Sequence, residues 1–289
     1  SIVRRTVRTR KSRARFALLY SQALDKNFID VDCDSLACIA TAYYRSRGNP
    51  DEKALAFYYR GRVYENAWKV DSAIIFYNQA EQYIAKTKNF YLKGLVANAL
   101  AGMYSSQRFS SLAKDKYLEA AGYFERIGHK KNMLINYAGA ISHFKISEDS
   151  EDCDHYLNLA EAIALELKDT VTLIGLARFR AYRILEEQAN YEHSLNIICK
   201  ARSEYCHNRV DPSFYLILSK IYLNLNKPDS AFLYLRPLIE QTANEHSRRR
   251  TEILYMAGSI CKAQHKYEQA YEYGNEALCI CDSIYFAEK

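Results

Sequence analysis

Small and large apolar residues recur along this chain at helical spacing. In residues 54–87 they follow the pattern G-x2-Y-x8-A-x3-Y-x2-A, formed by Gly61, Tyr64, Ala73, Tyr77 and Ala80. The small residues let two helix backbones approach, and the tyrosines fill the spaces beside them. Each buried aromatic contributes roughly 1.5–3 kcal/mol. The pattern predicts a pair of antiparallel helices, with a turn at residues 67–71 and Asp71 as the cap of the second helix.

The same four-point frame recurs through the chain: an anchor, then residues 9, 13 and 16 positions later. After the first copy it is occupied by Tyr104, Ala113, Tyr117 and Ala120; Phe144, Cys153, Leu157 and Ala160; Leu185, Ser194, Ile198 and Ala201; Tyr222, Ala231, Leu235 and Leu238; and Cys261, Ala270, Gly274 and Ala277. Proline and glycine are scarce, at 4 and 10 residues in 289, which argues against a sandwich or barrel with many turns. The fold class predicted is therefore all-α and repetitive.

The frame resembles the tetratricopeptide repeat (TPR) family. That family pairs G-x2-Y on its first helix with A-x3-F on its second, and Phe57 stands where it has its first large aromatic. The resemblance implies a right-handed α-solenoid of antiparallel helix pairs. Successive anchors are 37 to 41 residues apart rather than about 34, so the helices or loops are expected to be longer. Other α-solenoids of this period, such as HEAT arrays, remain an alternative.

The frame divides the chain into two parts. Residues 1–50 are expected to form an irregular capping pair: a long helix to about Lys26, a helix near Ser35–Ser46, and a stop at Gly48-Asn49-Pro50. Residues 51–289 are expected to form six TPR-like pairs in one continuous solenoid. The whole chain would then contain about seven pairs.

Residues 16–26 and 51–66 look like the amino-terminal halves of bacterial TPR proteins from gut anaerobes. Such proteins often carry a lipid or membrane anchor before the array, and a membrane helix with a signalling or DNA-binding segment after it. The resemblance implies one alternative function, the sensor part of a membrane-associated transcriptional regulator. Neither the anchor nor the tail lies within this sequence, so the compartment is left unassigned.

Basic residues crowd the first segment, although the net charge is a modest +6. This cluster is a candidate for nucleic-acid or anionic-membrane binding. The favoured interpretation is the solvated side of an amphipathic helix, because no aromatic residues interleave with the arginines. The basic positions are Arg4, Arg5, Arg8, Arg10, Lys11, Arg13 and Arg15, and the inward positions are Val3, Val7, Ala14, Ala17 and Leu18. Without a run of 18 apolar residues, no membrane span is expected.

The sequence offers no recognisable catalytic or metal-binding motif. Its eight cysteines form no CxxC pair, and we expect them to be small buried hydrophobic residues. His143 and His155 could approach each other across one helix pair, but a chance arrangement is favoured over a metal site. The acidic residues at 148–154 fit the start of a helix better than a calcium loop. We therefore predict no enzyme activity, no cofactor and no metal.

The function predicted is binding of a protein or peptide on the concave face lined by the first helix of each pair. Recurring cations there would grip a peptide's acidic side chains, and Arg62→Glu with Arg183→Glu is expected to abolish capture without loss of stability. A groove occupied by another part of the same protein is the alternative, and the partner is not identified. The predicted contact residues are Tyr58, Arg62, Glu65, Asn98, Ser105, Ser142, Phe179, Arg183, Lys220, Tyr255 and Lys262, with Lys145 also placed on this face.

Overall fold

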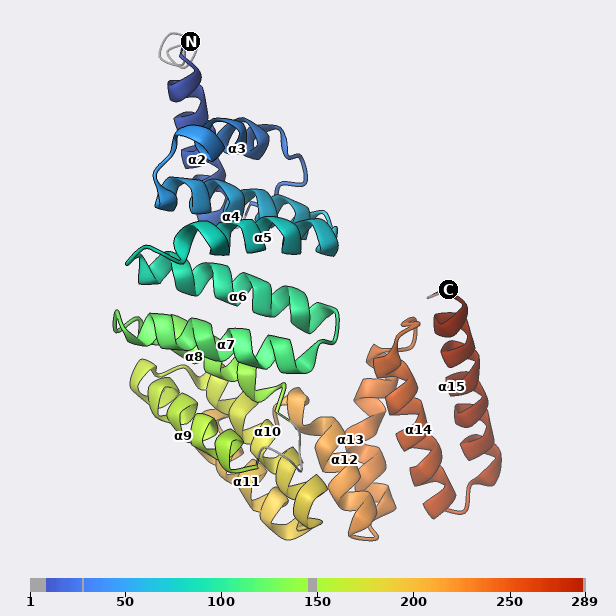
Figure 1. The fold of residues 1–289 in the computed structure, drawn as a ribbon. Coiled ribbons are helices and arrows are strands. Elements are labelled where there is room, and N and C mark those ends of the chain that lie inside the picture. The colour runs from blue at the N-terminus through green and yellow to red at the C-terminus, as the bar shows by residue number, and fades with distance from the viewer. Residues whose placement is uncertain (1–8, 28, 145–149, 288–289) are drawn as a thin grey trace. The chain divides into compact units, whose positions relative to one another are not determined.

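The structure, a computed structural model, describes residues 9–27, 29–144 and 150–287, and within them it contains α-helices, one 3-10 turn and no strand (Figure 1). The chain is therefore all-α, as predicted. The helices are α2 (Arg10–Lys26), α3 (Ser35–Arg47), α4 (Pro50–Asn66), α5 (Val70–Ile84), α6 (Phe90–Ser106), α7 (Ser110–Glu125), α8 (Lys130–Ile141), α9 (Ser150–Leu167), α10 (Thr170–Gln188), α11 (Tyr191–Tyr205), α12 (Tyr215–Asn224), α13 (Pro228–Gln241), α14 (Arg248–Ala263) and α15 (Tyr267–Ala287), with the 3-10 turn η1 at Pro212–Phe214.

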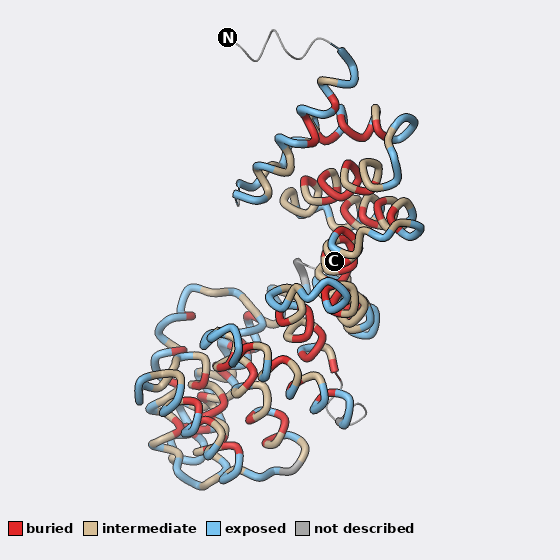
Figure 2. The backbone as a smooth tube through the Cα atoms, turned by 90° about the vertical axis from the view of Figure 1, so that its left-hand side faces the viewer, coloured by how far each residue is buried: buried red, intermediate tan, exposed pale blue. Residues whose placement is uncertain are grey.

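The chain divides into two compact units, residues 1–163 and 164–289. In the first unit, α4 packs against α5, α5 against α6, α6 against α7 and α7 against α8. The alternate helices α2, α4 and α6 also touch one another in turn. In the second unit α10 packs on α11, α12 on α13, and α14 on both α13 and α15. Buried positions lie on helix sides that meet neighbouring helices (Figure 2).

The four-point frame forms the core of this packing. The small residues 9 and 16 positions after the anchors Tyr64 and Tyr104 are fully buried. Those at the same positions after Phe144 and Leu185 are at most 2 % exposed. A fully buried Tyr77 shows why the frame needs its glycine. A Cβ added at Gly61 would lie 2.5 Å from the Tyr77 ring. The tyrosine therefore occupies the space that the missing side chain leaves.

The turn that follows each anchor is also repeated. The residue four positions after the anchor has a left-handed φ in each described copy: Trp68, Arg108, Ala189, Asn226 and His265. In four of these copies the next N–H donates to the anchor's carbonyl, from Lys69 to Tyr64, Phe109 to Tyr104, Lys227 to Tyr222 and Lys266 to Cys261. This geometry is the usual helix stop that favours glycine, yet none of these residues is glycine.

Helix boundaries near the amino terminus follow the prediction. Helix α2 ends at Lys26, α3 spans Ser35–Arg47, and Asn49 caps α4 while Pro50 opens it. Helix α3 packs on α4, so residues on both sides of position 50 belong to one compact unit. The prediction that Asp71 caps α5 is wrong. Lys69 occupies the cap position and Asp71 lies in the first turn, where a carboxylate still interacts favourably with the helix dipole.

The cysteines are less buried than predicted. None of the eight forms a disulfide, and Cys153 and Cys261 are buried where they occupy positions of the repeat frame. The prediction is wrong for the other six, of which Cys206 and Cys281 are partly buried and the remaining four are exposed. Burial here follows position in the frame, and the residue type alone did not predict it.

Candidate binding surfaces

The eleven predicted contact residues lie at very different depths. Tyr58 and Arg183 are buried, at 6 % and 5 % exposure, so both contribute to packing. The predicted Lys145 lies outside the described residues. The exposed members are Ser142, Tyr255 and Lys262, and the partly buried ones are Arg62, Glu65, Asn98, Ser105, Phe179 and Lys220.

Three of the predicted cations, Arg62, Arg183 and Lys220, are paired with carboxylates of the same chain. Arg62 Nε lies 2.9 Å from Asp25 Oδ1, and its Nη1 lies 2.8 Å from Glu65 Oε2. Glu65 also accepts the hydroxyl proton of Tyr77. Arg62 is thus held by carboxylates from two helices, α2 and α4, in a half-buried position.

The second unit repeats this arrangement. Arg183 Nε is 2.9 Å from Glu187 Oε1, and Lys220 forms an ion pair with Glu186 across α10 and α12. Reversing the charge of Arg62 and Arg183 would place two carboxylates beside others in partly or fully buried sites, which is strongly destabilising. Contrary to the expectation from the sequence, this double variant should therefore lose stability.

A pocket of about 320 Å³ lies where the first helices of the first unit meet. The end of α2 supplies Gln22, Asp25 and Lys26, and the start of α4 supplies Asn49, Asp51, Glu52, Leu55, Tyr58 and Tyr59. The start of α6 completes it with Asn89, Tyr91, Leu92 and Leu95. Its lining therefore combines aromatic and aliphatic side chains with three carboxylates. Such a combination of an apolar cavity with a few polar groups is typical of a ligand site.

The carboxylates around this pocket outnumber its one cation, Lys26. Asp25 is bound by Arg62, and Glu52 accepts the backbone N–H of Asn49 at 2.9 Å. Asp51 Oδ2 accepts from Asn89 Nδ2 at 3.0 Å, whereas Oδ1 is buried and has no donor among the described residues. Oδ1 is thus a buried acceptor without a hydrogen bond to the part of the chain that the structure describes.

Burial controls the ionisation of the pocket's tyrosines. It raises the pKa of Tyr58 and Tyr59 well above their ordinary value, and the Asp25 carboxylate acts in the same direction. Both phenols are therefore neutral at physiological pH and act as apolar walls with a hydroxyl. The rings of Tyr58 and Tyr59 meet edge to face, with centroids 5.1 Å apart.

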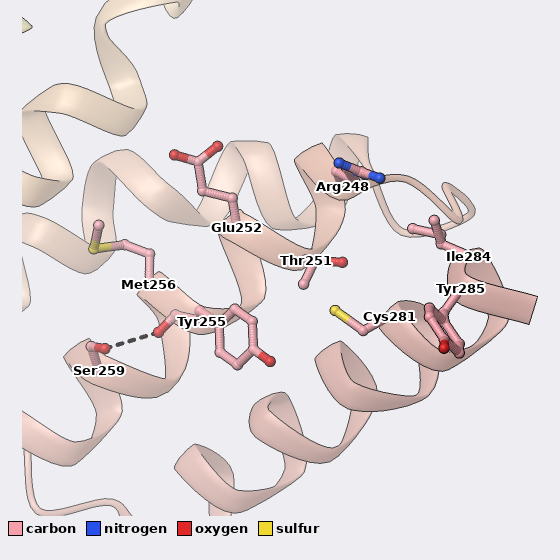
Figure 3. A pocket seen from close by; sticks show the side chains of 9 residues that line it. All are labelled: Arg248, Thr251, Glu252, Tyr255, Met256, Ser259, Cys281, Ile284 and Tyr285. Carbon is pink, nitrogen blue, oxygen red and sulfur yellow. Dashed lines mark hydrogen bonds between the residues drawn. The ribbon is translucent and has the colours of Figure 1, made fainter. Parts of the chain in front are cut away.

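A larger pocket, about 600 Å³, lies between α14 and α15 in the second unit (Figure 3). Helix α14 contributes Arg248, Thr251, Glu252, Tyr255, Met256 and Ser259, and α15 contributes Cys281, Ile284 and Tyr285. Thr251 and Cys281 point toward each other across it, and Ser259 donates to the carbonyl of Tyr255 at 2.9 Å. The predicted contact Tyr255 therefore lines a real cavity.

The structure does not support a metal site at the two histidines singled out in the sequence. His143 stacks on Tyr117 and His155 lies against Tyr156. Within residues 9–27, 29–144 and 150–287, no three side chains are placed to hold a metal ion. No described helix has the length and apolar character to cross a membrane.

The basic first helix is amphipathic as expected over its described part. Ala14, Ala17 and Leu18 are buried, while Lys11 and Arg15 face solvent. The predicted positions Val3, Arg4, Arg5, Val7 and Arg8 lie outside the described residues.

Neither a scan against protein-family models nor a search of curated proteins finds a match to this sequence.

Sequence reasoning missed the pocket between α2, α4 and α6. It placed contacts along the middle and end of each first helix, and of these only Tyr58 lines the pocket, which also uses the first turns of α4 and α6. A signal was present in the sequence: Asn49-Pro50-Asp51-Glu52 and Asn89 are cap and first-turn residues, and equivalent ends of successive repeats lie side by side. What the sequence did not show is that the end of α2 reaches the same place.

Proposed function

We propose that this protein is a TPR-like binding module whose first unit holds a partner peptide along α2, α4 and α6. The observation that carries the proposal is the 320 Å³ pocket formed jointly by these three helices. The two-helix repeats with a period near forty residues support a right-handed solenoid of about seven pairs, and such arrays bind partners on the face lined by their first helices.

The chemistry of the pocket favours a basic side chain on the partner. Asp25, Asp51 and Glu52 line it, against Lys26 as the one cation among its lining residues. An arginine or lysine has an apolar stem that packs on Tyr59 and Leu95, and a cationic head that donates to carboxylates. This differs from the acidic preference expected from the sequence. That preference depended on cations recurring along the groove, and one of them, Arg62, is bound by carboxylates of its own chain.

The volume limits what the pocket admits. About 320 Å³ is the lower end of the range for small-molecule sites, so it suits one or two side chains. A peptide that places one basic residue here would extend its neighbours over the exposed ring of Tyr91. Cation–aromatic contact adds to binding in such a site.

The test is selection of random twelve-residue peptides displayed on phage against the purified chain. We expect enriched peptides to share a lysine or arginine flanked by apolar residues. Their affinity should fall about tenfold or more for Asp51→Asn, a loss equivalent to about 1.4 kcal/mol. The matched control is Asp71→Asn, because Asp71 is also the second residue of its helix but lies outside the pocket.

Three results would count against the proposal. Enrichment of acidic peptides would reverse the charge preference. Equal binding by the wild type and Asp51→Asn would place the site elsewhere, and no enrichment over an unrelated helical protein would remove peptide binding altogether.

A further inference from the structure

Helix α15 carries an apolar stripe along one exposed side. The stripe residues follow one another at spacings of four and three, which places them on a single helix face. Tyr271 is 69 % exposed and Leu278 is 54 % exposed, although both side chains are large and apolar. The stripe consists of Tyr267, Tyr271, Gly274, Leu278, Cys281 and Tyr285.

On α13, which precedes α14 in the second unit, the equivalent face is covered by α14. On α13 the equivalent residues, 39 positions earlier, are Phe232, Leu235 and Ile239. They pack in one apolar cluster with Ile253, Ala257 and Ile260 of α14. The first unit repeats this, since Ile74, Tyr77 and Ile84 of α5 belong to one cluster with Leu92, Val96 and Leu100 of α6. In this fold, the outer face of the second helix of a pair is therefore a packing surface for the helix that follows it.

In the sixth copy of the frame, the outer face of α15 is not covered by another described helix, and its frame residues are less buried. Ala231 and Leu235 of α13 are fully buried, whereas the equivalent Ala270 and Gly274 of α15 are only partly buried. A Cβ added at Gly274 would meet no described atom within 4 Å. Beside the stripe lies the 600 Å³ pocket, whose other wall is Tyr255 and Ser259 of α14 (Figure 3).

Charge identifies the kind of helix that fits. Helix α15 contains four carboxylates and no lysine or arginine. Glu276 is bound by Arg250 at 2.7 Å, while Glu268, Glu272 and Asp282 are exposed. At 100° per residue Asp282 and Glu268 flank the stripe on the side away from α14, and Glu272 lies farther round the same side. A covering helix with basic residues on that flank would be attracted, and a second copy of α15 would bring like charges together.

Helix α14 shows how a helix with a basic residue binds the outer face of the preceding helix. Its arginine Arg250 donates from Nη1 to the carbonyl of Ile239 at 2.6 Å and to Thr242 Oγ1 at 3.2 Å, both at the end of α13. A covering helix with an arginine at its start could reach the end of α15 in the same way. The stripe from Tyr267 to Tyr285 is about 27 Å long, which a helix of about 18 residues matches.

We propose that the exposed face of α15, with the adjoining pocket, binds an amphipathic helix of a partner protein that carries lysine or arginine along one flank. This site lies wholly within the second unit and is independent of the peptide pocket proposed in the first. Apolar contacts along the stripe provide affinity, and the carboxylate flank selects for the basic partner.

Two synthetic twenty-residue helical peptides test the proposal by fluorescence anisotropy. They share one apolar stripe of leucine and alanine, and their flank positions are all lysine in one and all glutamate in the other. We expect the lysine peptide to bind about tenfold more tightly or better, and its affinity to fall as salt screens the flank charges. Leu278→Asp and Tyr271→Asp should each weaken it about tenfold, whereas Leu233→Asp, at an exposed leucine of α13, should not.

Other outcomes overturn the proposal. Equal binding of both peptides would remove the charge selection, and unchanged binding by both stripe variants would move the site. Light scattering on the purified chain distinguishes the competing occupant: a dimer that Leu278→Asp converts to monomer would show that a second copy covers this face. Far-UV circular dichroism confirms that the variants remain helical.

Discussion

Replacing Gly61 by alanine perturbs the repeat frame at its tightest contact. The new Cβ would lie 2.5–3.0 Å from three ring atoms of Tyr77, closer than real Cβ contacts come. The ring has little freedom to move, because Tyr77 is fully buried, its hydroxyl is bound by Glu65 and Tyr58 lies 5.7 Å away. We therefore expect Gly61→Ala to lower the free energy of unfolding.

The magnitude follows from two opposing effects. Overpacking a filled core costs about 1–3 kcal/mol, and replacing a mid-helix glycine by alanine returns about 1 kcal/mol. Gly102 in α6 is the matched control, because a Cβ there meets no described atom within 4 Å. Gly102→Ala should therefore gain stability by up to about 1 kcal/mol, and the difference between the two variants isolates the overpacking cost.

Urea denaturation followed by circular dichroism at 222 nm measures both variants. A double-mutant cycle with Tyr77→Leu adds a second check, since Gly61→Ala should become stabilising once the ring is gone. If Gly61→Ala proved as stable as Gly102→Ala, the pairing of a small and a large residue would not be what holds this helix pair together.

Three further outcomes are expected. Arg108→Gly should raise the free energy of unfolding in urea by about 0.5–1 kcal/mol, because Arg108 has a φ of +62° at a helix stop; a decrease would contradict the turn geometry. Arg62→Met should lower the free energy of unfolding by about 1–3 kcal/mol, because it removes the cation that pairs with two half-buried carboxylates. Arg236→Met, which breaks a well-exposed pair with Glu240, should lower it by about 0.5 kcal/mol or less in the same assay. Burial raises the pKa of Tyr58 and Tyr77 in the folded chain, so the unfolded chain loses these protons first. Stability should then be unaffected by them below pH of about 10 and fall above it; urea titrations at pH 9, 10 and 11 should show a shallower fall for Tyr77→Phe, and identical slopes would refute the assignment.

The helix pairs could be predicted from the sequence because their cause is local. A small residue, a large residue and a turn recur within one pair, so Gly61, Tyr77 and Ala80 already specify how two helices meet. The repeated left-handed turn was not predicted, because its residues include Trp68 and Arg108 rather than glycine. At these positions the repeated packing fixes the backbone despite an unfavourable residue type.

The binding surfaces were harder to predict because they depend on distant pairs. Arg62 is bound by Asp25, which lies 37 residues earlier, and no local pattern shows that contact. From local patterns alone, Arg62 was therefore predicted to be available to a partner, and the carboxylates beside the pocket were not predicted. In the same way, the exposed stripe of α15 looks like an ordinary buried helix face until its neighbours are known.

The most direct test of the account is hydrogen–deuterium exchange of the chain with and without a peptide selected on it. We expect slower exchange at the end of α2 and in the amino-terminal halves of α4 and α6, around residues 22–26, 49–59 and 89–95. Protection confined instead to the second helices α5 and α7, with these three segments unchanged, would contradict it.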